Sequence, residues 1–176
     1  MGRILCIDYG TKRIGLAISD ETRTIARGLD TLTVTAEHLD RRETPYSRAV
    51  SAKGPPEFTQ VLAAIARIVA EQEVERIILG YPLSQAGNPT QRSRQVEEFK
   101  AMLTRAVSVP IELVDERFSS VLARQYLSEA YRNVRAQRHP VDKVAAVVIL
   151  EDYLERNRKS VESVDKNPEN GTADGR

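Results

Sequence analysis

Apolar positions at the start of the chain follow the pattern of two neighbouring strands. Ile4–Ile7 is an uninterrupted apolar run, which is typical of a strand that is buried on both faces. Gly10 marks a turn, and Ile14–Ile18 is a second apolar run. These residues predict a hairpin whose first strand is central in its sheet. Ile25–Val34 alternates loosely and predicts a third antiparallel strand, at the edge.

The rest of the chain alternates between helical and strand patterns. Apolar residues at helical spacing predict helices over Glu57–Glu73, Thr90–Ala106, Ser119–Leu127 and Val141–Tyr153. Short apolar runs predict strands at Arg76–Tyr81 and Pro110–Val114. Alternating helices and strands indicate parallel pairing with right-handed crossovers. The fold class is therefore α/β, with a five-stranded mixed sheet, an antiparallel meander followed by parallel strands, and helices on both faces.

Two segments depart from these patterns. Residues Thr35–Pro56 lack sustained periodicity, and a loop of this length inside a compact domain is unusual. It is either a surface insertion or a functional segment. Beyond Asn157 the composition turns polar, so we expect one domain over residues 1–157 and a disordered tail over residues 158–176.

Composition limits the classes of function. The 176 residues are 41% hydrophobic and 29% charged, which fits a soluble globular protein. No apolar run is long enough for a membrane span or a signal peptide, and the single cysteine, Cys6, excludes an internal disulfide. These features favour the cytoplasm and no membrane partner. The net charge is only +1, so binding to nucleic acid would need a local basic patch.

Three acids stand out by their position in the predicted elements. Asp8 ends the first strand, Glu116 follows the last strand, and Asp142 lies in the first turn of the last helix. Each has an ordinary explanation: a turn cap, an ion pair with Arg117, or complementation of the helix dipole. However, all three are expected at one edge of the sheet. Carboxylates held together repel unless a cation such as Mg²⁺ or Mn²⁺ binds them, and two such ions can drive phosphodiester hydrolysis.

Four blocks then resemble a known family. The segments IDYGTKRIGLAISD, IILGYPL, VDERFSS and VDKVAAVVIL, in this order, are similar to the signature blocks of the YqgF (RuvX) family. The resemblance covers residues 1–157 and implies an RNase H-like fold. It also implies a metal-dependent nuclease with Asp8, Glu116 and Asp142 as its catalytic and metal-binding triad. Members are described as Holliday junction resolvases and as nucleases that mature the ends of pre-16S ribosomal RNA.

Basic residues near the acids are candidates for phosphate contacts, which give affinity with little sequence choice. They lie in the first hairpin, at the start of the second helix and around the last helix. These residues are Lys12, Arg13, Arg92, Arg94, Arg117, Arg132, Arg135, Arg138 and Lys143.

Other interpretations stay open at this point. The hairpin also resembles the phosphate loop of actin/Hsp70-type ATPases, but one lobe cannot form their nucleotide cleft. A non-catalytic RNA- or ribosome-binding module is the stronger alternative, although such a module has no reason to keep three mutually repelling acids. Pre-rRNA and branched DNA cannot be separated as substrates, because both are recognised through the backbone. A monomer and a homodimer are equally compatible with the sequence.

Overall fold

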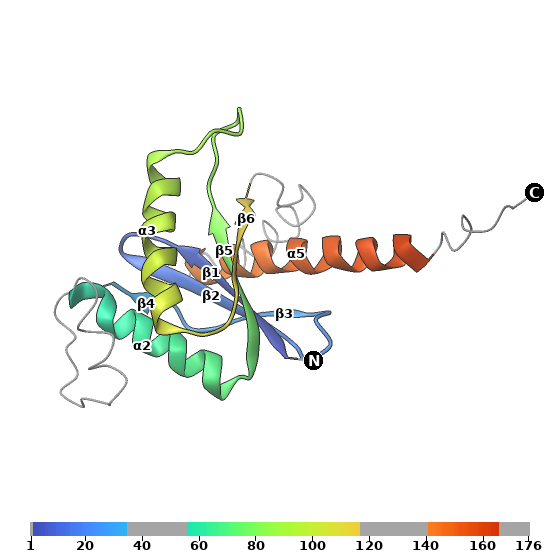
Figure 1. Cartoon of the computed structure of the whole chain (residues 1–176), viewed down its shortest axis with the longest axis horizontal. Coiled ribbons are helices and arrows are strands. Elements are labelled where there is room, and N and C mark those ends of the chain that lie inside the picture. Colours follow the sequence, from blue (N-terminus) through green and yellow to red (C-terminus); the bar gives the residue numbers. More distant parts are fainter. Residues whose placement is uncertain (1, 35–55, 117–140, 166–176) are drawn as a thin grey trace, which may run out of the picture.

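A mixed sheet with helices on both faces forms the structure (Figure 1). This computed structural model describes residues 2–34, 56–116 and 141–165. The strands are β1 (Arg3–Tyr9), β2 (Arg13–Ser19), β3 (Ala26–Gly28), β4 (Leu32–Thr33), β5 (Val74–Tyr81) and β6 (Ile111–Asp115). The helices are α2 (Pro56–Glu71), α3 (Gln91–Ala106) and α5 (Val141–Asp165).

The central position predicted for the first strand is confirmed. The strand order is β3-β2-β1-β5-β6, with β4 also pairing with β2. β1 and β2 form the predicted antiparallel hairpin, in which Asp8 faces Gly15. β5 is parallel to β1 and to β6, as the alternation of helices and strands predicted. The carboxyl ends of β1, β5 and β6 therefore meet at one edge of the sheet, which we call the carboxyl edge.

The prediction of a single third strand over Ile25–Val34 is wrong, so the sheet has six strands and not five. β2 pairs Ala17 with Gly28 in β3, but it pairs Ile14 with Leu32 in β4. Three residues after Gly28 thus face only two residues of β2, which is the signature of a bulge. The extra residue interrupts the ladder and divides the predicted strand in two. Hydrophobic alternation carries little information about such a shift.

Two separate cores cover the two faces of the sheet. α2 and α3 pack on one face around Phe99, which is fully buried, and α5 packs on the other face around Ala146. Because successive residues of a strand point to opposite faces, Leu5 and Ile7 face the first core while Ile4 and Cys6 face α5. Cys6 is fully buried, as predicted.

The last helix is longer than its apolar pattern predicted. α5 continues to Asp165 and so includes the start of the segment for which the sequence predicts disorder. In Figure 1 this polar end runs well past the sheet. Ion pairs between residues four apart support it: Arg156 pairs with Asp152, and Lys159 lies 2.6 Å from Glu155. Residues 166–176 lie outside the described part, and the domain boundary near residue 157 stays a prediction.

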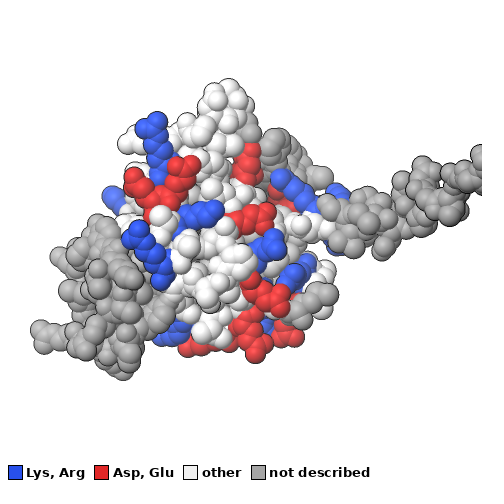
Figure 2. All heavy atoms as spheres, in the orientation of Figure 1, with Lys and Arg blue, Asp and Glu red and all other residues white. Residues whose placement is uncertain are grey.

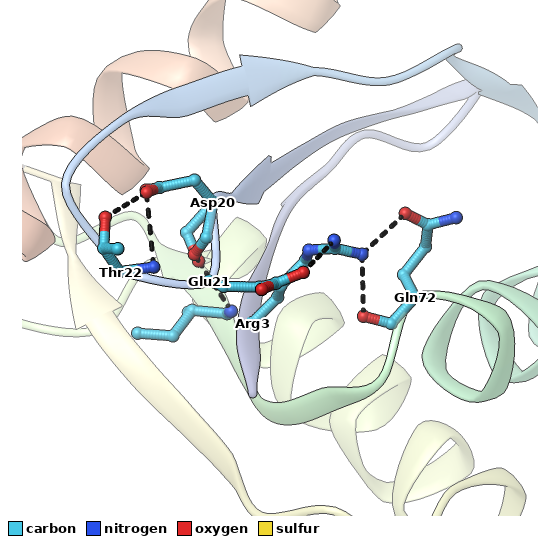
Figure 3. A network of polar contacts seen from close by, with 7 residues as sticks. Arg3, Asp20, Glu21, Thr22 and Gln72 are labelled. Atoms are coloured by element: carbon cyan, nitrogen blue, oxygen red, sulfur yellow. Dashed lines mark hydrogen bonds and ion pairs between the residues drawn. The ribbon is translucent and has the colours of Figure 1, made fainter. Parts of the chain in front are cut away.

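A network of charged side chains fastens the amino end of the sheet (Figure 3). The guanidinium of Arg3, at the start of β1, donates to the Gln72 carbonyl at 3.3 Å and to the Glu21 carboxylate at 2.8 Å. Asp20, directly after β2, accepts a hydrogen bond from the backbone N–H of Thr22 at 3.2 Å. Hydrogen bonds and an ion pair thus connect the strand ends and loops at this end of the sheet. The acids singled out by the sequence lie at the other end.

Candidate active site at the carboxyl edge of the sheet

Two of the three predicted acids are brought together by β1 and β6, which lie on either side of β5. Asp8 lies near the end of β1, and Glu116 directly follows β6. One strand, β5, separates β1 from β6. Cys6 and Val114 both belong to the core beneath α5, and each acid lies two residues further along its strand. Because side chains alternate along a strand, both acids occupy the α5 face of the sheet at its carboxyl edge.

The electrostatics of Glu116 show that the two acids affect each other. Burial, followed by the negative charge of Asp8, raises the pKa of Glu116 to about 7. The positive charge of Arg92 acts in the opposite direction. The same two acids also act on the thiol of Cys6, which precedes Asp8 in β1. Burial raises the pKa of this thiol most, and the charges of Asp8 and Glu116 raise it further. These carboxylates therefore form a half-buried acidic pair whose full ionisation is costly without a cation.

The third acid, Asp142, lies in the first turn of α5. The contacts of α5 show which way this turn points. The Tyr153 hydroxyl donates to Glu112, near the start of β6, at 2.9 Å, whereas Ile149 lies beside Gly80, near the end of β5. Moving back along α5 thus leads towards the carboxyl edge. The first turn of α5, which includes the backbone of Asp142, therefore lies towards this edge, and the Asp142 side chain lies outside what the structure describes.

Basic residues of the carboxyl edge come from two elements. Lys12 and Arg13 are exposed in and beside the turn between β1 and β2. Arg92 and Arg94 are exposed in the first turn of α3. Figure 2 shows that acidic and basic side chains are interspersed over the visible face. Charges of both signs on this face agree with the net charge of only +1, so attraction of a polyanion would come from local groups.

The start of α3, which carries Arg92 and Arg94, is fixed to the end of β5. Thr90 caps the helix: its hydroxyl accepts the N–H of Ser93 at 3.2 Å, and the Ser93 hydroxyl accepts the N–H of Thr90 at 2.8 Å. Both hydroxyls also donate to the Pro82 carbonyl. This capping box gives the two arginines a defined position relative to the strand beside Asp8.

All of the predicted nucleic-acid contacts stay predictions, and several of the residues concerned lie outside the described part of the chain. Arg117, Arg132, Arg135 and Arg138 lie outside the described residues, and so does the Lys143 side chain. The predicted helix over Ser119–Leu127 and the segment Thr35–Pro56, apart from its last residue, also lie outside them.

The donor set of the acidic pair suits a hard divalent cation. Carboxylate oxygens are the preferred protein ligands of Mg²⁺ and Mn²⁺, and a cation would relieve the repulsion between Asp8 and Glu116. Among the side chains that the structure describes, no group of three metal-binding residues occurs. Two acids are therefore in place, and a third ligand would have to come from beyond these side chains.

The sequence also contains a site residue whose role was missed. Gly80 lies within the predicted strand Arg76–Tyr81 and was given no role in the site, but the carboxylate of Glu116 lies directly against it. A glycine inside an otherwise apolar strand is a known sign of a close approach to the backbone, and the run RIILGY carries that sign.

Comparison with known proteins gives a consistent result. The profile of the RuvX family, described as Holliday junction resolvase, matches residues 2–45 and 44–156. The two matched segments meet inside the Thr35–Pro56 segment. None of the helices in the described part of the chain combines the length and apolar character needed to cross a bilayer.

Relatives in several bacteria carry the name "Putative pre-16S rRNA nuclease". The protein of Maridesulfovibrio salexigens is 37% identical over 154 residues, which cover 88% of this chain and 98% of the relative. That of Koribacter versatilis is 34% identical over 155 residues, which cover 88% of each chain.

Two solved structures share the fold. Thermus thermophilus RuvC in complex with a Holliday junction substrate has a TM-score of 0.55 at 13% identity, over 90% of this chain and 96% of RuvC. The yeast mitochondrial Holliday junction resolvase has a TM-score of 0.51 at 11% identity, over 93% of this chain and 84% of the resolvase. The RNase H-like fold expected from the sequence is thus confirmed.

Proposed function

Because the chain belongs to the RuvX family of Holliday junction resolvases, we propose that it is a nuclease that hydrolyses phosphodiester bonds in structured nucleic acid. The observation that carries this proposal is the acidic pair of Asp8 and Glu116, held on either side of β5 at the carboxyl edge of the sheet. Buried acids of like charge destabilise a fold, and their retention is explained by a bound cation. Cleavage of ribosomal RNA precursors would place the protein in the cytoplasm.

Asp8, Glu116 and Asp142 would hold Mg²⁺ or Mn²⁺, and two ions are expected. When bound, the ions lower the pKa of a water and stabilise the leaving oxygen. The chain's own contribution is to fix the ligands. β1 and β6 hold Asp8 and Glu116, and the N-terminal turn of α5 carries Asp142. Burial leaves the Glu116 carboxylate only partly accessible to water.

Two substrates fit the proposal. The relatives' names point to pre-16S ribosomal RNA, and the family description points to four-way DNA junctions. The described surface does not distinguish them, since exposed arginines contact the phosphates of either nucleic acid. A non-catalytic RNA- or ribosome-binding module stays the alternative. It would bind the same nucleic acids and would be indifferent to the loss of Asp8.

A direct assay tests the proposal. Purified protein is incubated with a labelled pre-16S 5′-end fragment, with a four-way DNA junction and with a linear duplex of matched sequence. Each is tested with Mg²⁺, with Mn²⁺ and with EDTA. We expect cleavage of one structured substrate in the presence of metal only. Binding without cleavage under all metal conditions would instead support the non-catalytic module.

Removing Arg92 and Arg94 together should flatten the salt dependence of nucleic-acid binding. Each phosphate contact on duplex DNA contributes about 0.9 to the slope of log affinity against log salt. We therefore expect the slope to fall by up to about 1.8 in the R92A/R94A variant, measured by fluorescence anisotropy with a labelled junction in EDTA. The matched control is R67A/R105A, which removes two exposed arginines near the ends of α2 and α3. Equal slopes in the two variants would mean that Arg92 and Arg94 are ordinary surface charges.

A further inference from the structure

Gly80 lies in β5, the strand between the two acids. β5 pairs Leu79 with Ile7, so Gly80 is next to Asp8, and it pairs Gly80 with Val114, two residues before Glu116. A methyl group on Gly80 would overlap the Glu116 Oε1 atom and lie 3.3 Å from its Cδ. It would also lie 3.1 Å from Cδ1 of Ile149 in α5. The Glu116 carboxylate thus occupies the space where any other residue would have its side chain.

Backbone conformation does not explain a glycine at this position. Among the glycines that the structure describes, only Gly87 has a positive φ. Gly80 is in ordinary strand geometry, where alanine is accepted and where glycine lowers stability through its greater backbone entropy when unfolded. What glycine provides here is space on the α5 face.

We propose that Gly80 is a positioning residue for Glu116. Its missing side chain lets the carboxylate fold back across β5, beneath Ile149 and towards Asp8. The distance between the two acids is thereby set by a residue that carries no functional group. The structural part of this inference stands alone, and its catalytic consequence rests on the proposed function.

The crystal structure of the G80A variant tests the positioning directly. A glutamate side chain can change rotamer, so we expect the Glu116 carboxylate to swing away from β5 while the strands keep their register. Finding the carboxylate in its original place, with the alanine methyl accommodated, would overturn the inference whatever the protein's activity.

Thermal melts and rates test the consequence. We expect G80A to melt in EDTA at or above the wild-type temperature, because the Glu116 carboxyl leaves its buried position near Asp8 and strand propensity improves. Its Mn²⁺-induced rise in melting temperature should be largely lost, and its nuclease rate should fall about a hundredfold through misplacement of one ligand. The control G28A adds a methyl to a strand glycine in β3 and should behave as wild type.

A double variant separates this role from a general effect on the strand. In the E116A background, adding G80A should change neither the Mn²⁺ response nor the rate, since no carboxylate is left to displace. A further loss of Mn²⁺ response in E116A/G80A would show that Gly80 acts independently of Glu116. If wild type itself cleaves no substrate, the proposed function fails, but the position of Glu116 in the G80A crystal still decides the positioning inference.

Discussion

Replacing Asp8 by asparagine is expected to lower the rate of phosphodiester cleavage on the order of a thousandfold while the protein stays folded. Asparagine has nearly the same shape but lacks the charge that binds a cation. Without metal, the variant should be as stable as wild type or more stable, on the order of 1 kcal/mol, because the repulsion from Glu116 is relieved. The measurements are single-turnover cleavage and thermal melts in EDTA and in Mn²⁺.

Metal should reverse this ranking of stabilities. A ligand that binds only the folded state adds about 2.7 kcal/mol at a hundredfold excess over its dissociation constant. Wild type should gain this stabilisation, and D8N should gain less. A D8N protein that cleaves at the wild-type rate, and that melts lower with and without metal, would identify Asp8 as a structural turn cap.

Asp20 provides the matched control for this experiment. It lies at the opposite end of the sheet, where hydrogen bonds, first from the backbone N–H of Ile25, lower its pKa to about 2. Its carboxylate therefore has a structural role. The D20N variant should lose stability in EDTA and in Mn²⁺ alike, and its folded fraction should cleave at the wild-type rate.

Replacing Glu116 by glutamine is expected to remove a pH-dependent loss of stability. In the folded protein Glu116 keeps its proton up to about pH 7, whereas in the unfolded chain it releases it near the ordinary value of 4.5. Between these values the folded state binds more protons, so its stability falls as the pH rises through the window and stays low above it. The loss is on the order of 2 kcal/mol, since solvent still reaches part of the carboxylate. Urea titrations of wild type and E116Q from pH 4.5 to 8, in EDTA, measure it.

Divalent metal should cancel the same loss. A cation displaces the proton from Glu116, so stability in Mn²⁺ should rise with pH where stability in EDTA falls. E71Q, which alters an exposed carboxylate at the end of α2, should follow wild type under both conditions. Parallel curves for wild type and E116Q in EDTA would show that Glu116 is ionised in the folded protein throughout this range.

The elements that were predicted correctly are those with a strong period of their own. Ile4–Ile7 could only be a doubly buried strand, and the helical spacing of Val96, Phe99 and Leu103 left one interpretation for α3. The parallel pairing of β5 followed from connectivity, because strands joined through helices pair in parallel. The approach of Asp8 to Glu116 followed in turn, since both come at strand ends of one parallel set.

The features that could not be predicted depend on contacts between elements. The bulge between β3 and β4 is a register shift against β2, and no single strand encodes its partner's register. The length of α5 beyond its apolar part depends on ion pairs such as Lys159–Glu155, which are weak signals in a polar sequence. The close approach of Glu116 to Gly80 requires knowing that β5 lies beside β6.

Because Cys6 is buried, the reaction of its thiol with a reagent can report when the layer between α5 and the sheet opens. Cys6 is the only cysteine in the sequence, it is fully buried between the sheet and α5, and its raised pKa keeps it as the unreactive thiol. A thiol reagent therefore reaches it only when this layer opens, so the rate of labelling measures how often α5 separates from the strands that carry the acids. A cysteine introduced at an exposed position would, in the closed protein, be the one that accepts a dye, without removal of the native thiol.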